Sequence, residues 1–129
     1  MEQLKLKGTE KTPSIDFNSQ TGKLHIGGRS YSSDAFEFYK PVNEWLSKYI
    51  ENPSQQTELE VNVDYFHSVS IKYLTTIIKK IAQLHERGKS VKVIWRHQSD
   101  ENDEDESLDL GRSIEGESRV KFDFVEISS

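Results

Sequence analysis

The spacing of apolar residues changes from two to three or four near residue 66, and this change predicts a strand followed by a helix. Over residues 58–65 apolar and polar positions alternate, as in a strand with one buried face. Over residues 71–84 the apolar positions recur every three or four residues, as in an amphipathic helix. Gly88 suits the C-terminal cap of that helix, and Ser68 or Ser70 suits its N-terminal cap.

Shorter alternating runs predict the remaining strands. Residues 14–18 and 23–27 flank a polar turn and should form a hairpin, which Gly27-Gly28 is expected to end. Residues 90–96 and 120–127 should form two further strands. The first 13 residues lack periodicity and are expected to form a loose lead-in or an edge strand.

Two more segments have helical spacing. In residues 34–50 the apolar positions share one face, and Asp34 with Glu37 could form a capping box. Pro41 leaves two possibilities, because it either kinks one helix or follows a short turn and starts a helix. The acidic segment is expected to contain a short helix near residues 103–114.

The order of these elements predicts the fold class. Strand, helix and strand over residues 58–96 make a βαβ unit with parallel strands and a right-handed crossover. Because the strands alternate and are not continuously apolar, one face of the sheet should be open or thinly covered. We therefore expect one α/β domain over residues 1–129, with two layers: a mixed sheet of about five strands with its helices mainly on one face.

Composition narrows the possible functions. The chain has 129 residues, no cysteine and a formal net charge of −5, which disfavours nucleic acid as a partner. No cysteine means no disulfide and no thiolate site. The first residues lack the apolar core of a signal peptide, and no run is long enough to span a bilayer. We expect a soluble, cytoplasmic protein that does not bind membranes.

Metal and catalytic motifs are weak. The four histidines lack metal-ligand spacing, and the acidic run has Asp105 where a calcium loop requires glycine, so no metal or cofactor is expected. Asp64, His67 and Ser68 invite a hydrolytic reading, but they lie on one tight loop without a nucleophile elbow. We expect no enzyme activity; a small-molecule-binding or hydrolytic α/β domain that uses these three residues is the alternative.

Ser68 is the more informative candidate. It lies between the end of a strand and the start of a helix, where backbone N–H groups and the helix dipole tolerate a phosphate. From the residues alone, the favoured interpretation is that Ser68 or Ser70 is an ordinary helix cap.

Several short motifs, taken in their shared order, resemble those of the SiaC family of bacterial regulatory phosphoproteins, which are related in shape to the STAS domains of anti-sigma-factor antagonists. The resemblance covers most of the chain. Its motifs are Thr12-Pro13, Gly28 with Ser30-Tyr31, Tyr39-Lys40-Pro41-Val42 with Trp45-Leu46, the loop Tyr65-Phe66-His67-Ser68-Val69-Ser70, and Trp95 followed by the acidic run.

This resemblance implies a role in partner switching and c-di-GMP signalling. A cognate protein kinase would phosphorylate the loop hydroxyl, a PP2C-like phosphatase would remove the phosphate, and the unphosphorylated form would bind and activate a diguanylate cyclase. Family members typically have threonine in place of Ser68 and asparagine in place of His67; serine keeps the acceptor hydroxyl, with Ser70 as the alternate. The residues expected to contact the partner are Asp64, Tyr65, Phe66, His67, Val69, Ser70 and Lys72.

Overall fold

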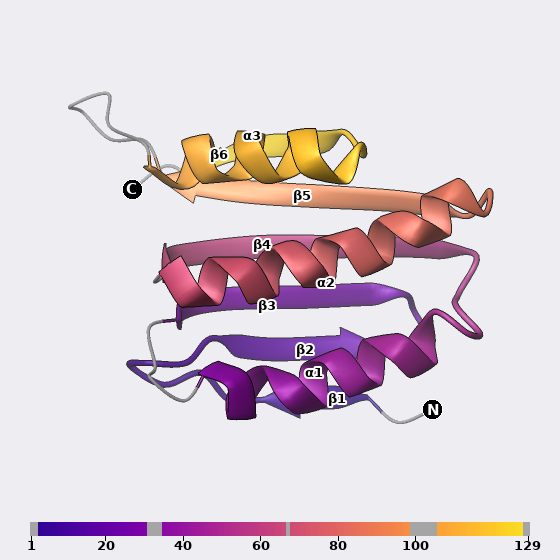
Figure 1. Ribbon diagram of the computed structural model, residues 1–129, viewed down its shortest axis with the longest axis horizontal. Helices are drawn as coiled ribbons and strands as arrows, with labels where there is room; N and C mark the ends of the chain where they lie inside the picture. Colours follow the sequence, from indigo (N-terminus) through magenta and orange to yellow (C-terminus); the bar gives the residue numbers. More distant parts are fainter. Residues whose placement is uncertain (1–2, 31–34, 67, 99–105, 128–129) are drawn as a thin grey trace.

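The computed structural model describes residues 3–30, 35–66, 68–98 and 106–127, and it contains one six-stranded sheet and three helices (Figure 1). The strands are β1 (Leu4–Leu6), β2 (Ser14–Asn18), β3 (Lys23–Ser30), β4 (Gln56–Phe66), β5 (Ser90–Gln98) and β6 (Phe122–Ile127). The helices are α1 (Ala35–Tyr49), α2 (Ser68–Glu86) and α3 (Glu106–Ser118).

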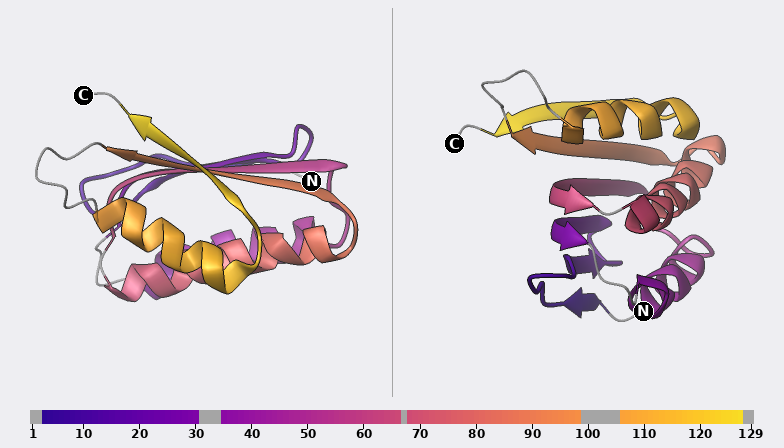
Figure 2. Two further views of the ribbon diagram at one scale, coloured as in Figure 1. Left: turned by 90° about the horizontal axis from the view of Figure 1, so that it is seen from above. Right: turned by 60° about the vertical axis from the view of Figure 1, so that its left-hand side comes forward.

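The strands follow one another across the sheet in chain order, from β1 to β6. The pairs β1–β2 and β2–β3 are antiparallel, and the pairs from β3 to β6 are parallel. Each parallel connection passes through a helix, and all three helices cover the same face (Figure 2). The predicted two-layer α/β fold is confirmed, with six strands in place of about five, since the three residues of β1 also pair.

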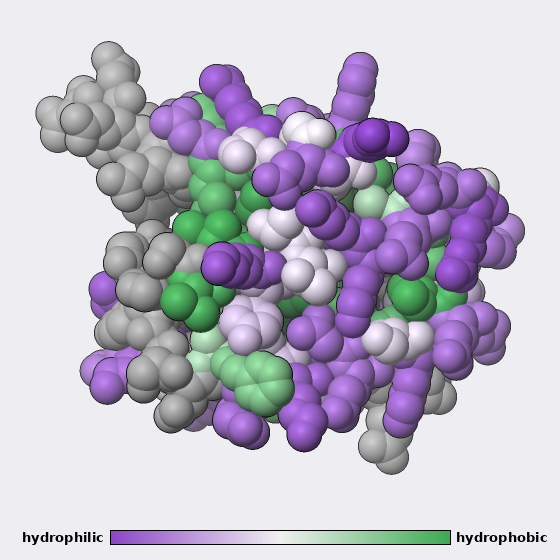
Figure 3. Space-filling model, in the orientation of Figure 1, coloured by the Kyte–Doolittle hydropathy of each residue, from purple (hydrophilic) through white to green (hydrophobic). Residues whose placement is uncertain are grey.

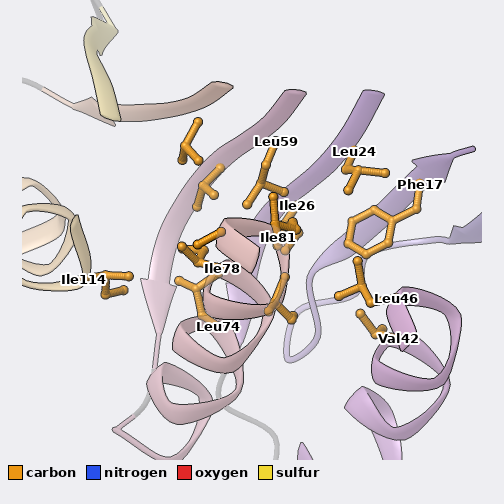
Figure 4. Packing of buried hydrophobic residues seen from close by; sticks show 14 of the residues in the cluster. Phe17, Leu24, Ile26, Val42, Leu46, Leu59, Leu74, Ile78, Ile81 and Ile114 are labelled. Carbon is orange, nitrogen blue, oxygen red and sulfur yellow. The ribbon is translucent and has the colours of Figure 1, made fainter. Parts of the chain in front are cut away.

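The core lies between the sheet and the helices. In β4, for example, Leu59 and Val61 are fully buried, whereas Glu58 and Glu60, which alternate with them, face the other side. Figure 4 shows side chains of the strands meeting those of the helices in this layer. Alternation in the sequence thus gives one apolar face covered by helices and one polar face without them. None of the described helices is long and apolar enough to cross a membrane.

Pro41 neither starts α1 nor ends it. The helix is continuous from Ala35 to Tyr49, and Pro41 is an exposed residue within it. The buried residues Tyr39, Val42 and Leu46 on either side of the proline pack into the core, which offsets the hydrogen bond that proline cannot donate. Asp34 of the predicted capping box lies outside the described residues.

The hairpin pairing ends at Gly27 as expected, since Gly27 opposite Ser14 is the last pair of β3 with β2, but the strand itself does not end there. Strand β3 continues to Ser30 beside β4, with a shift in register between Gly28 and Arg29. Gly28 has a φ of +100°, which glycine adopts without strain. The break in the pattern therefore marks an irregularity within the strand.

The C-terminal elements are displaced from their predicted bounds. Helix α3 ends at Ser118, four residues later than expected, and β6 starts at Phe122 because Arg119 has a positive φ of 64°. Within α3, Gly111 packs against the Trp95 ring, where a Cβ atom would come within 2.8 Å. The missing side chain at Gly111 therefore allows α3 to lie close against β5. The acidic residues 99–105 lie outside the described residues.

Candidate functional site

Ser68 is the first residue of α2, directly beyond the end of β4. Ser30 at the end of β3 pairs with Phe66 at the end of β4, so the carboxyl ends of two parallel strands meet beside the start of the helix. In open α/β sheets this edge is where ligands and functional loops gather. The N-terminus of α2 also carries the positive end of the helix dipole.

A β-bulge precedes this junction. Gly28 pairs with Val63, but Arg29 pairs with Tyr65, so Asp64 is an extra residue in β4 with no opposite residue in β3. Bulges locally increase twist and redirect the chain, and they are frequent beside functional sites. The bulge therefore sets the direction in which the chain enters the loop.

The predicted contact residues fall into two groups. The side chains of Asp64, Tyr65, Phe66 and Ser68, and the whole of His67, lie outside the described part of the chain. Val69, Ser70 and Lys72 are described: Val69 is 47% exposed, Lys72 is exposed and Ser70 is 1% exposed. The side chains of the alternative catalytic group, Asp64, His67 and Ser68, therefore all lie outside what the structure describes.

Ser70 differs from its prediction. It lies within the first turn of α2, and its Oγ atom is buried and has no hydrogen-bond partner among the described residues. It therefore does not cap the helix, and in this conformation it offers no accessible hydroxyl to a kinase. Burial also removes Ser70 from the surface that a partner could contact. The helical spacing accounts for this, because Ser70 shares a face with the buried Leu74 and Ile77.

Tyr39 links the neighbouring elements. Its Oη atom lies 2.8 Å from Ser30 Oγ, and its ring stacks on Tyr73 of α2 at 5.0 Å with an interplanar angle of 7°. Burial raises the pKa of Tyr39 to about 12, and the hydrogen bond with Ser30 opposes part of this shift. Sequence reasoning placed Tyr39 on the buried face of its helix but gave no signal for either contact.

One exposed aromatic side chain was missed altogether. Phe36, in the first turn of α1, is 63% exposed. Among the described residues, Val69 is the only other large apolar side chain that is exposed. Both residues lie in the first turns of their helices, and these two helices are neighbours. The sequence does contain a signal for this exposure, because helical spacing places Phe36 outside the apolar face of α1.

A polar cavity of about 380 Å³ lies elsewhere, on the open face of the sheet. Beside it, Glu60 accepts from Arg96 Nε at 3.1 Å and lies 2.9 Å from His25 Nδ1. The lining residues are Gln3, Asp16, Asn18, Thr21, Lys23, Leu24, His25, Glu58 and Glu60. They come from β2, β3, the start of β4 and the segments beside these strands, whereas Ser68 follows the end of β4, so this cavity and the loop are separate. No described group of histidines and carboxylates has an arrangement that could hold a metal.

Comparison with known proteins gives one consistent result. The family model described as SiaC family regulatory phosphoprotein matches residues 6–127. An uncharacterised protein of Pseudomonas aeruginosa strain UCBPP-PA14 is 28% identical over 97 residues, which cover 75% of this chain and 77% of that protein.

Solved structures share the fold over nearly the whole chain. Apo-SiaC from Pseudomonas aeruginosa superposes with a TM-score of 0.84 at 25% identity, covering 97% of this chain and 99% of that one. A chain in the crystal structure of the diguanylate cyclase SiaD with its activator SiaC, from the same organism, gives 0.81 at 24% identity, covering 98% and 99%. With the family match over residues 6–127, these findings show that the chain belongs to the SiaC family of regulatory phosphoproteins.

Proposed function

We propose that this protein is a phosphorylation-controlled switch whose unphosphorylated form binds and activates a diguanylate cyclase. A kinase phosphorylates Ser68 and thereby releases the cyclase, and a PP2C-like phosphatase restores binding. The switch occupies a single domain, acts in the cytoplasm, where a kinase has ATP, and performs no catalysis of its own.

The position of Ser68 is the observation that carries this proposal. Ser68 begins α2 at the carboxyl edge of the parallel strands, next to the exposed Val69. Ser70 has the same chemistry two residues later but is buried in the helix–sheet layer. Of the two candidate acceptors, Ser68 is therefore the one we assign.

The identity of the partner rests on a relative. In Pseudomonas aeruginosa, SiaC is the activator found in complex with the diguanylate cyclase SiaD. The present chain has the same fold and belongs to the same family. A diguanylate cyclase is therefore the effector to test first, since a shared fold alone does not establish a shared partner.

Charge gives the switch its physical form. A phosphate on Ser68 adds about −1.5 to −2 charges at neutral pH. In a protein interface that charge would have to be desolvated, which costs free energy unless a partner group neutralises it. In the free protein, the positive end of the α2 dipole and water stabilise the phosphate, so the domain stays folded. Phosphorylation therefore disfavours the complex more than it disfavours the free protein.

The test combines phosphosite mapping with binding. Mass spectrometry of the protein from native cells should place phosphate on Ser68 and not on Ser70. Purified Ser68→Ala should bind the cyclase as the wild type does, whereas Ser68→Asp should not. Circular dichroism of both variants controls for folding. Equal binding by Ser68→Ala and Ser68→Asp would contradict the proposal, as would native phosphate found only elsewhere.

A further inference from the structure

The exposed surface at the start of α2, which includes the predicted contact residues Val69 and Lys72, continues onto the start of α1. Tyr39 and Tyr73 stack across the two helices. Phe36 precedes Tyr39 by three residues and Val69 precedes Tyr73 by four, so each lies about one turn before the stack. Figure 3 shows apolar surface exposed over these helix ends, at the left of the view. We call Phe36, Lys40, Val69, Lys72 and Tyr73 the N-terminal seam.

Exposure of Phe36 has no role in holding the domain together. At 63% exposure, most of the apolar area of its ring is in water. Burial of an aromatic ring in an interface would therefore gain a large hydrophobic free energy, because such rings carry a large apolar area. Aromatic anchors of this kind are enriched in the energetically important centres of protein interfaces. The nearby Val69, at 47% exposure, extends the apolar area onto the second helix.

Each of the two helices carries an exposed lysine about one turn beyond its exposed apolar residue. Lys40 and Lys72 are exposed, and neither forms an ion pair within the part of the chain that the structure describes. The exposed acids Glu37 and Glu44 lie further round α1 from α2 by helical spacing. In a chain of net charge −5, this end of the helical layer therefore suits an acidic partner segment.

The size of a specific interface points to the same surface. Such interfaces use about 20–30 residues from each partner. The predicted contact set of the loop has seven residues, and one of them, Ser70, is buried. An interface of ordinary size must therefore extend beyond these residues, and the exposed surface at the start of α1 adjoins them.

We propose that the N-terminal seam is part of the docking surface for the effector, and that the effector segment carries an apolar side chain flanked by carboxylates. The apolar side chain packs between Phe36 and Val69, and the carboxylates pair with Lys40 and Lys72. This inference rests on the proposed function, because the effector is the protein that Ser68 controls.

The seam also sharpens how the phosphate acts. Ser68 and Lys72 are four residues apart in α2, so they share one face of the helix. A phosphate on Ser68 pairs with the Lys72 ammonium and withdraws it from the effector's carboxylates. Phosphorylation then both adds negative charge and removes the positive charge that the partner needs.

The seam is tested by calorimetry, which measures the affinity of the wild type and of each variant for the purified diguanylate cyclase. Phe36→Ala should weaken binding about tenfold or more, as at interface anchors, while the neighbouring control Glu37→Ala stays within about twofold. If Phe36→Ala binds like wild type while Ser68→Asp still prevents binding, the seam is excluded and the switch survives. If wild type binds no cyclase, the proposed function itself fails. A change in self-association of Phe36→Ala, with cyclase binding intact, would show a self-interface and overturn the proposal.

Charge reversal tests the lysines. Lys72→Glu should weaken binding about tenfold at low salt, and the loss should shrink as salt is added. Lys48→Glu is the matched control: it makes the same charge change in the last turn of α1, away from the seam, and should have little effect on binding. In Lys72→Ala the further loss of affinity on phosphorylation should be smaller than in wild type, because no ammonium remains to be withdrawn. Equal losses in the two backgrounds would contradict the pairing of phosphate with Lys72.

Discussion

The two ends of the contact between α1 and α2 are built differently. At the C-terminal end, polar bonds cross between the elements: Lys80 Nζ donates to Ser47 Oγ at 3.1 Å, and an Arg87 guanidinium nitrogen donates to the Ile50 carbonyl at 2.8 Å. At the N-terminal end a ring stack holds the helices, and Phe36 is exposed beside it.

This difference separates stability from recognition. The C-terminal end is joined by side-chain hydrogen bonds and leaves no large apolar side chain exposed among the described residues. The N-terminal end leaves apolar area and two lysine charges in water, directly beside the proposed phosphorylation site. Changes at the first end should therefore alter the free energy of unfolding, whereas surface changes at the second should alter binding.

The largest expected effect comes from the core. Leu46 in α1 is fully buried, so Leu46→Ala removes packed atoms and leaves a cavity. The free energy of unfolding should fall by about 2–5 kcal/mol. Urea denaturation followed by circular dichroism measures this change. A loss below about 1 kcal/mol would show that Leu46 is not packed as described.

A pH-dependent effect of about 2–3 kcal/mol is expected from Tyr39. Burial raises its pKa from 10 to about 12, so the folded state holds the phenol proton more tightly than the unfolded state. The stabilisation is therefore complete below pH 10 and is lost as the pH rises towards 12. The stability difference between wild type and Tyr39→Phe should shrink over that window, as measured by denaturation at several pH values.

The same substitution also has an effect at neutral pH. Tyr39→Phe leaves the buried Ser30 hydroxyl without its partner, which should cost about 1–3 kcal/mol. Adding Ser30→Ala removes the unpaired group and should recover part of the loss. A double variant no more stable than Tyr39→Phe alone would argue against the hydrogen bond as the cause.

A smaller effect is expected at the C-terminal end of the helix pair. Lys80→Met keeps the aliphatic stem but removes the donor to Ser47 Oγ and to the Asn43 carbonyl oxygen. The free energy of unfolding should fall by about 0.5–1.5 kcal/mol, while the affinity for the cyclase stays unchanged. Weakened binding without a loss of stability would reverse the roles assigned to the two ends.

The smallest change in stability should come from the exposed aromatic residue. Phe36→Ala is expected to alter the free energy of unfolding by less than about 0.5 kcal/mol, because the ring is 63% exposed. The same variant is expected to lose affinity for the effector. A large drop in the thermal midpoint would instead assign Phe36 to the fold.

Strong periodicity made the centre of the fold predictable. Strand β4, helix α2 and strand β5 alternate or repeat clearly in the sequence, and they form the predicted parallel βαβ unit. Strand β1 has three residues, too few to show a period, so the sequence there predicts either a loose lead-in or an edge strand. The continuation of β3 depends on the φ of Gly28, a conformational freedom that the sequence reveals only as a break.

The candidate site was predictable in place but not in detail. The change of period located the junction before α2, and helical spacing could have shown that Ser70 faces the core. The exposure of Phe36 follows from its position off the apolar face of α1, but the stack of Tyr39 on Tyr73 depends on how two helices pack together. Tertiary packing of this kind leaves no local pattern in either helix.

The most direct test of the switch is calorimetric titration of the diguanylate cyclase with three forms of this protein: unphosphorylated wild type, protein phosphorylated stoichiometrically on Ser68, and Ser68→Ala treated with the same kinase. The proposed switch predicts binding by the first and third forms and loss of binding by the second. Equal affinity for all three forms would contradict it.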